Sequence, residues 1–159
     1  MGNSQALQMS VHAAVSATSL IALICDNTLS NEKYKKVKKT VFKLHKDVLE
    51  YNKKLLILET DYQKNEADKI KKESLKKAIK ISLEVRKIAQ AIEKVGFRLT
   101  KIGDKNMHAD ARTAIHLAHA SSKSALENIK VNKQSLTKLG IGKQSLTKLG
   151  IGKQSLAKL

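Results

Sequence analysis

Residues 106–136, NMHADARTAIHLAHASSKSALENIKVNKQSL, decide the fold of this chain. The stretch is dense in alanine and serine, small residues that let a neighbouring helix approach closely. Asp110 stands near its start, where a negative charge is favourable at the N-terminus of a helix. Asparagines and lysines stand near its end. We predict a tightly packed central helix with a polar site at each end.

Two other segments carry apolar residues at alternating steps of three and four, the period of an amphipathic helix. One runs from Tyr34 to Tyr62 and the other from Leu75 to Ile102. Four extra apolar residues widen the apolar face of the first helix: Phe42, Leu49, Leu56 and Ile57. We therefore predict that this helix packs against two neighbours. The polar residues 61–74 predict the break between the two helices.

The run Met9–Cys25 is apolar but short for a membrane span, and it contains His12 and several hydroxyl residues. We predict a buried helix of a bundle, with membrane insertion as the less favoured alternative. No positive region precedes the run, which argues against a signal peptide, so we expect a cytoplasmic protein.

The chain has 159 residues and no proline, and its strand-forming residues never alternate over a long run. We therefore predict an all-α fold, an up-and-down helical bundle of long amphipathic helices. Residues 1–136 form the predicted bundle. Residues 137–159 form a basic tail, built on the ten-residue repeat KQSLTKLGIG, which extends the last helix or is frayed.

The formal net charge is +17, and nearly all of the positive charge is lysine. Arginine and stacked aromatic residues, which nucleic-acid readers favour, are scarce, so nucleic acid is not the expected partner. A solvated lysine surface is the preferred interpretation, and a membrane surface bound through the basic tail remains the alternative.

The histidine, aspartate and cysteine residues are not spaced in the sequence as the ligands of a metal site or the residues of a nucleophilic site would be. His116 and His119 share a helix face, but Asp110 lies far round the helix from them, so we predict no metal site and surface positions for both histidines. Cys25 is the single cysteine, which excludes a thiolate cluster within one chain. We expect His12 to be a hydrogen-bonded core residue.

The central stretch resembles the cyclodeaminase family, which comprises the cyclodeaminase part of formiminotransferase-cyclodeaminase and stand-alone methenyltetrahydrofolate cyclohydrolases. Gly103 and Asn106 precede HADARTA, with Asp110 at the position of the family's acid. Three further polar residues follow in ENIKVNKQSL: Asn128, Lys130 and Asn132.

Two other stretches are similar to the same family. NTLSNEKYKKV follows the first apolar run and aligns Thr28 and Tyr34, and LETDY aligns Asp61. Together the three stretches cover about residues 5–136 in order.

The resemblance implies a helical bundle that forms a homodimer and acts on a folate-type small molecule, without a cofactor. The reaction would be cyclodeamination of 5-formiminotetrahydrofolate or hydrolysis of 5,10-methenyltetrahydrofolate. Asp110 and Asp61 would be catalytic. The resemblance also implies these substrate-binding residues: Thr28, Asn106, Arg112, Asn128, Lys130 and Asn132.

The chain departs from the family pattern at three places. SQALQ, residues 4–8, replaces a glycine-rich entry, Arg112 stands where the family has glycine, and the loop after Asp61 is shortened. Two hypotheses therefore stay open: a folate one-carbon enzyme, with its activity kept or lost, and a non-catalytic basic helical protein that binds a partner or an anionic surface.

Overall fold

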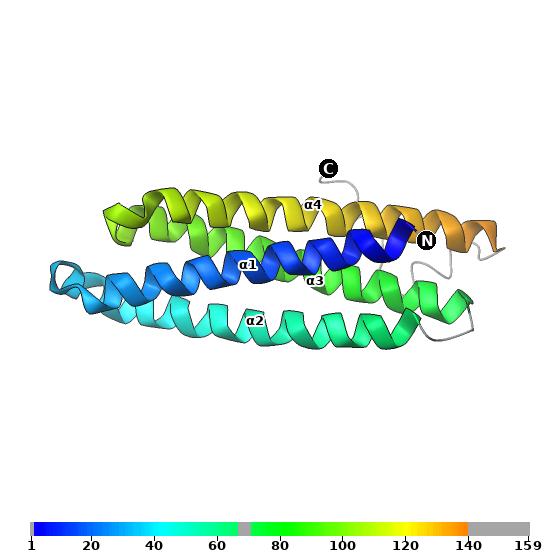
Figure 1. Cartoon of the computed structure of the whole chain (residues 1–159), viewed down its shortest axis with the longest axis horizontal. Helices are drawn as coiled ribbons and strands as arrows, with labels where there is room; N and C mark the ends of the chain where they lie inside the picture. The colour runs from blue at the N-terminus through cyan, green and yellow to red at the C-terminus, as the bar shows by residue number, and fades with distance from the viewer. Residues whose placement is uncertain (1, 67–70, 140–159) are drawn as a thin grey trace.

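The structure, a computed structural model, describes residues 2–66 and 71–139. Over these residues, successive long helices run in opposite directions and form one elongated bundle (Figure 1). The elements are α1 (Gly2–Ser30), η1 (Glu32–Val37), α2 (Lys38–Glu66), α3 (Lys71–Ile102), η2 (Lys105–Met107) and α4 (His108–Lys138). The predicted all-α bundle is confirmed. Apart from its first residues, Thr137 to Leu139, the predicted tail lies outside the described residues.

Helices α1 and α4 pack closely because small residues line both sides of their contact. The Ser10 hydroxyl donates to the Ser121 carbonyl at 2.7 Å, and the Ser121 hydroxyl donates to the Ser10 carbonyl at the same distance. The Ser124 hydroxyl donates to the Ala6 carbonyl at 3.0 Å. The predicted close approach of the alanine- and serine-rich helices is therefore confirmed.

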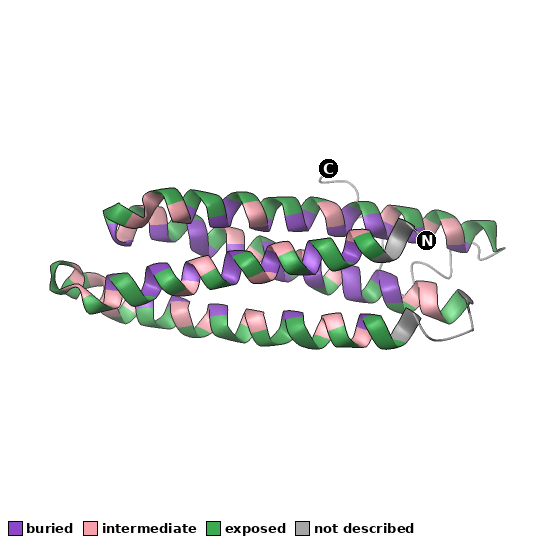
Figure 2. Cartoon of the chain, in the orientation of Figure 1, coloured by how far each residue is buried: buried purple, intermediate pink, exposed green. Residues whose placement is uncertain are grey.

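Helix α1 turns one apolar face into the bundle, where Leu7, Val11, Ile21 and Ile24 are buried. Figure 2 shows the buried positions on the inward sides of the helices and the exposed positions on the outer sides. Residues 5–30 are long and apolar enough to cross a membrane by length and composition alone. Their packing inside the bundle is that of a core helix.

Helix α2 lies against α1 and α3 through Val41, Val48 and Leu55, which are all buried. The four residues expected to widen this seam lie outside it: Phe42, Leu49, Leu56 and Ile57 are exposed. The prediction that this helix packs against two neighbours is confirmed, but the expectation that these four residues widen its buried face is wrong. Each follows or precedes a core position by one residue, and one residue rotates a side chain about 100° round a helix.

Gly96 brings α3 close to α4. A Cβ atom on Gly96 would lie 2.6 Å from Cγ1 of Ile115, so the glycine leaves the space that this isoleucine occupies. The two helices are therefore in close contact at this level. Gly103 follows the last residue of α3, a position where glycine commonly ends a helix.

Candidate functional site

The α1–α2 and α3–α4 connections lie at the same end of the bundle, and hydrogen bonds join them (Figure 1). The Asp104 backbone N–H donates to the Thr28 hydroxyl at 2.9 Å, and the Thr28 hydroxyl donates to the Ile24 carbonyl at 2.7 Å. Thr28 was predicted to bind substrate. In the structure both of its hydrogen-bonding roles are taken by the backbone.

The Asp104 carboxylate is the acceptor at the centre of this end. It accepts from the Asn106 backbone N–H at 2.9 Å, from the Asn31 side chain at 3.3 Å and from the Tyr34 hydroxyl at 3.4 Å. These hydrogen bonds, the Asn106 bond first, lower the pKa of Asp104 from its ordinary value. Asp104 holds the two connections together.

Asp104 is not among the site residues predicted from the sequence, where the family resemblance indicates Asp110 instead. The signal was present: an aspartate one residue after Gly103 and just before a helical turn is a preferred N-cap. Asn31 is the corresponding N-cap in the α1–α2 connection, where its side chain accepts from the Lys33 backbone N–H at 3.0 Å.

Asp110 lies in the first turn of α4, close to the Asp104 cluster along the chain. It is partly exposed, and no described residue forms a hydrogen bond or ion pair with its carboxylate. Asn106 is exposed at the same end and uses its backbone N–H on Asp104. Of the two aspartates here, Asp104 is committed to the fold and Asp110 is available to a ligand.

Arg112 lies at the surface between α3 and α4 and lines a hollow of about 370 Å³. We call this the Arg112 hollow; its other lining residues are Phe97, Thr100, His108 and Ile115. The hollow combines an exposed aromatic ring with a cation and an imidazole. Asp110 does not line it, because two residues along a helix separate side chains by about 200°.

Asn128 and Asn132 are buried farther along α4. The Asn128 side-chain oxygen accepts from the Ser82 hydroxyl at 2.9 Å and from the Asn132 amide at 2.6 Å. Lys130 points elsewhere and pairs with Glu127 at 2.8 Å. Eighteen residues of helix separate Asn128 from Asp110, which is about 27 Å along the axis.

The two predicted catalytic acids are also far apart. The contacts of Ser10 with Ser121 and of His12 with Glu59 place Asp61 near the level of Ser121 along the bundle. Eleven residues of helix separate Ser121 from Asp110, or about 16 Å. Within one chain, therefore, Asp61 and Asp110 cannot contact the same reacting atoms.

The histidines are at the surface. His116 and His119 are exposed as predicted, and His119 lies 3.2 Å from Glu93. His12 is hydrogen-bonded, at 2.8 Å from Glu59, but it is exposed, so its predicted core position is wrong. Across the described ranges, histidine, cysteine and acidic side chains nowhere gather in threes that could hold a metal ion.

A family model described as formiminotransferase-cyclodeaminase matches residues 56–148, more than half of the chain. The chain belongs to the formiminotransferase-cyclodeaminase family. The match spans the C-terminal part of α2, all of α3 and α4, and both predicted catalytic acids, Asp61 and Asp110. The resemblance seen in the sequence is thereby confirmed.

The bundle is also similar to the crystal structure of formiminotetrahydrofolate cyclodeaminase from Thermotoga maritima. The TM-score is 0.78 at 18% sequence identity, over 90% of this chain and 74% of that chain. At this identity the similarity establishes a shared fold for this member of the formiminotransferase-cyclodeaminase family. No curated protein sequence matches the chain significantly.

Proposed function

We propose that this chain is a folate one-carbon enzyme that converts 5-formiminotetrahydrofolate to 5,10-methenyltetrahydrofolate and ammonia. The observation that carries the proposal is the unpaired, partly exposed Asp110 carboxylate in a chain of this family. A carboxylate without a protein partner can exchange a proton with a ligand, whereas one held by several donors, like Asp104, cannot do so readily.

Starting from the protonated formimino group, N5–CH=NH2+, the chemistry needs one proton moved between two nitrogens, and the methenyl product keeps the positive charge. In the ring closure, N10 of the folate attacks the formimino carbon, and the bond from that carbon to the departing nitrogen then breaks. N10 loses a proton as its bond forms, and the leaving nitrogen gains one as ammonia departs. Asp110 serves as the base for the first transfer and the acid for the second.

The Arg112 hollow lies on a different face of α4 from Asp110, and it offers contacts suited to a ligand that carries an aromatic ring and a carboxylate. Phe97 is 53% exposed there and provides a face on which an aromatic ring can stack. Arg112 provides a guanidinium group for a carboxylate. Arg112 lies within the first two turns of α4, and Phe97 lies opposite it on α3.

A homodimer would resolve the separation of the predicted acids. In a two-fold symmetric dimer with antiparallel bundles, Asp61 of the second copy can lie at the level of Asp110 of the first copy. We therefore propose that the site is completed across such an interface. Residues at opposite levels of one rigid bundle can share a ligand only in this way.

The test follows the absorbance of the methenyl bridge with 5-formiminotetrahydrofolate as substrate. Asp110→Asn should lower kcat by about 10²-fold or more, the usual contribution of a general acid-base residue. Asp47→Asn, a change of the same kind on α2, should leave turnover unchanged. Absence of turnover by the unmodified chain, or equal activity of Asp110→Asn, would refute the proposal. Incubation with 5,10-methenyltetrahydrofolate alone separates cyclodeamination from hydrolysis.

A second, non-catalytic function is favoured by the lysines at the end of the bundle that holds Asp104. Exposed lysines cluster there on both connections: Lys33, Lys35, Lys36, Lys39, Lys101 and Lys105. Such a cluster attracts an anionic surface, and salt weakens the attraction. Sedimentation with vesicles containing phosphatidylserine tests it; a requirement for these lysines together with no folate turnover would favour this function.

A further inference from the structure

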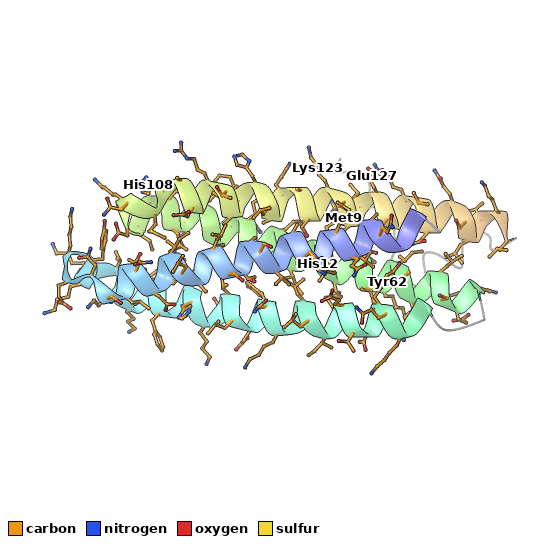
Figure 3. The ribbon with its side chains drawn as sticks, in the orientation of Figure 1. Met9, His12, Tyr62, His108, Lys123 and Glu127 are labelled. Carbon is orange, nitrogen blue, oxygen red and sulfur yellow. The ribbon has the colours of Figure 1, made fainter. Side chains whose placement is uncertain are left out.

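A second hollow, of about 570 Å³, lies farther along the groove between α3 and α4. We call it the Arg86 hollow, after the α3 residue that lines it together with Ser122 and Lys123 of α4. In Figure 3, Lys123 and Glu127 project from the outer side of α4, well away from His108 at the other end of that helix. The proposed folate reaction uses none of these residues.

The donors of the Arg86 hollow lack protein partners. The Nε atom of Arg86 is buried and has no hydrogen-bond acceptor. Ser122 is only 8% exposed, and within residues 2–66 and 71–139 nothing accepts from its hydroxyl. Lys123 likewise forms no ion pair with any residue whose position is described. A buried polar group without a partner costs free energy, so this arrangement favours a ligand that accepts hydrogen bonds.

The acids that line the same hollow are already paired. Glu93 lies 3.2 Å from His119, and Glu127 lies 2.8 Å from Lys130. The hollow therefore presents a guanidinium, an ammonium and a hydroxyl as free donors, while its carboxylates are paired with His119 and Lys130. This pattern fits an anion and disfavours a cation.

We propose that the Arg86 hollow binds a small oxyanion, a carboxylate or a phosphate group, through Arg86, Ser122 and Lys123. Arginine suits this role because its planar guanidinium group can donate two parallel hydrogen bonds to two oxygens of a carboxylate or a phosphate. Arg86 is one of only three arginines in a chain whose positive charge is otherwise lysine, and Arg98 and Arg112 are exposed.

Isothermal titration calorimetry at fixed ionic strength, with inorganic phosphate and with glutarate as separate probes, tests the proposal. Arg86→Gln should weaken binding of the preferred probe by roughly tenfold or more, the usual worth of a hydrogen bond to a charged group. Arg98→Gln removes the same charge from an exposed position of the same helix and should leave the affinity unchanged. The probe that binds more tightly identifies the anion as phosphate or carboxylate.

Ser122→Ala and Lys123→Gln provide independent variants, and each should weaken binding by a smaller factor. Lys123 is exposed, so its replacement leaves the packing intact. The proposal is overturned if neither probe shows saturable binding, or if Arg98→Gln weakens binding as much as Arg86→Gln. Because no folate is present, these results are independent of the proposed one-carbon activity.

Discussion

The Asp104 backbone N–H donates to the Thr28 hydroxyl at 2.9 Å, so a residue just beyond α3 is bonded to the last turn of α1. Both groups are buried. This hydrogen bond joins the two connections at one end of the bundle, and it fixes where α4 begins relative to α1.

Thr28→Val tests this bond. The substitution keeps the shape of the side chain but leaves the Asp104 N–H without an acceptor, which costs about 1–3 kcal/mol for a buried donor. Urea unfolding should show a loss of that size. Thr113→Val removes a hydroxyl that bonds only to its own helix at an exposed position, and it should cost much less. Equal losses would show that the link between connections adds no stability.

The stability of the fold should depend on the ionisation of Asp104. Its pKa is lowered from 3.8 by the Asn106, Asn31 and Tyr34 hydrogen bonds, so the charged form is favoured in the folded state. A lowered pKa gives stability that is present above pH 3.8 and is lost as pH falls through the lower folded value. The stability difference between the unmodified chain and Asp104→Asn, from urea unfolding, should therefore be constant near neutral pH and shrink in acid. A difference that does not change in acid would contradict this.

Leu55 and Leu56 are adjacent in α2 but differ in burial, at 0% and 47% exposed. Leu55→Ala should destabilise the chain by about 2–5 kcal/mol because it leaves a cavity in the core. Leu56→Ala should change stability by no more than about 0.5 kcal/mol in the isolated chain. Thermal unfolding of the pair compares them directly, and a large loss from Leu56→Ala would mean that a second surface covers this position.

Gly96→Ala should destabilise the α3–α4 contact. The added Cβ would lie 2.6 Å from Cγ1 of Ile115, and overpacking of this kind costs about 1–3 kcal/mol. The better helix propensity of alanine offsets about 1 kcal/mol of that cost. In an Ile115→Ala background the clash is absent, so there the same substitution should stabilise the chain. A double-mutant cycle by urea unfolding measures this coupling.

Cys25 should be unreactive in the folded chain. Burial, together with the nearby charge of Asp26, raises the pKa of its thiol to about 12. Since the thiolate is the reactive form, Ellman's reagent should label Cys25 at pH 8 only after unfolding. Rapid labelling of the native chain would contradict the buried position.

The sequence predicted the helical fold because each long helix carries its own signal. Apolar residues recur at the helical period from Tyr34 to Tyr62 and from Leu75 to Ile102, and no proline interrupts them. The predicted break within residues 61–74 also agrees with the structure, where α2 ends at Glu66 and α3 begins at Lys71. These features are local, so they can be read from neighbouring residues alone.

The tertiary structure alone decided which polar residues act together. By sequence, Asp110, Asp61 and Asn128 belong to one family pattern. In one chain, however, Asp61 and Asn128 lie about 16 and 27 Å from Asp110 along the bundle axis. The Arg86 hollow likewise joins residues of α3 and α4 that are far apart in the sequence. A periodic pattern fixes the inward face of a helix, but not the level at which two helices meet, since packing contacts such as Ser10 with Ser121 set that level.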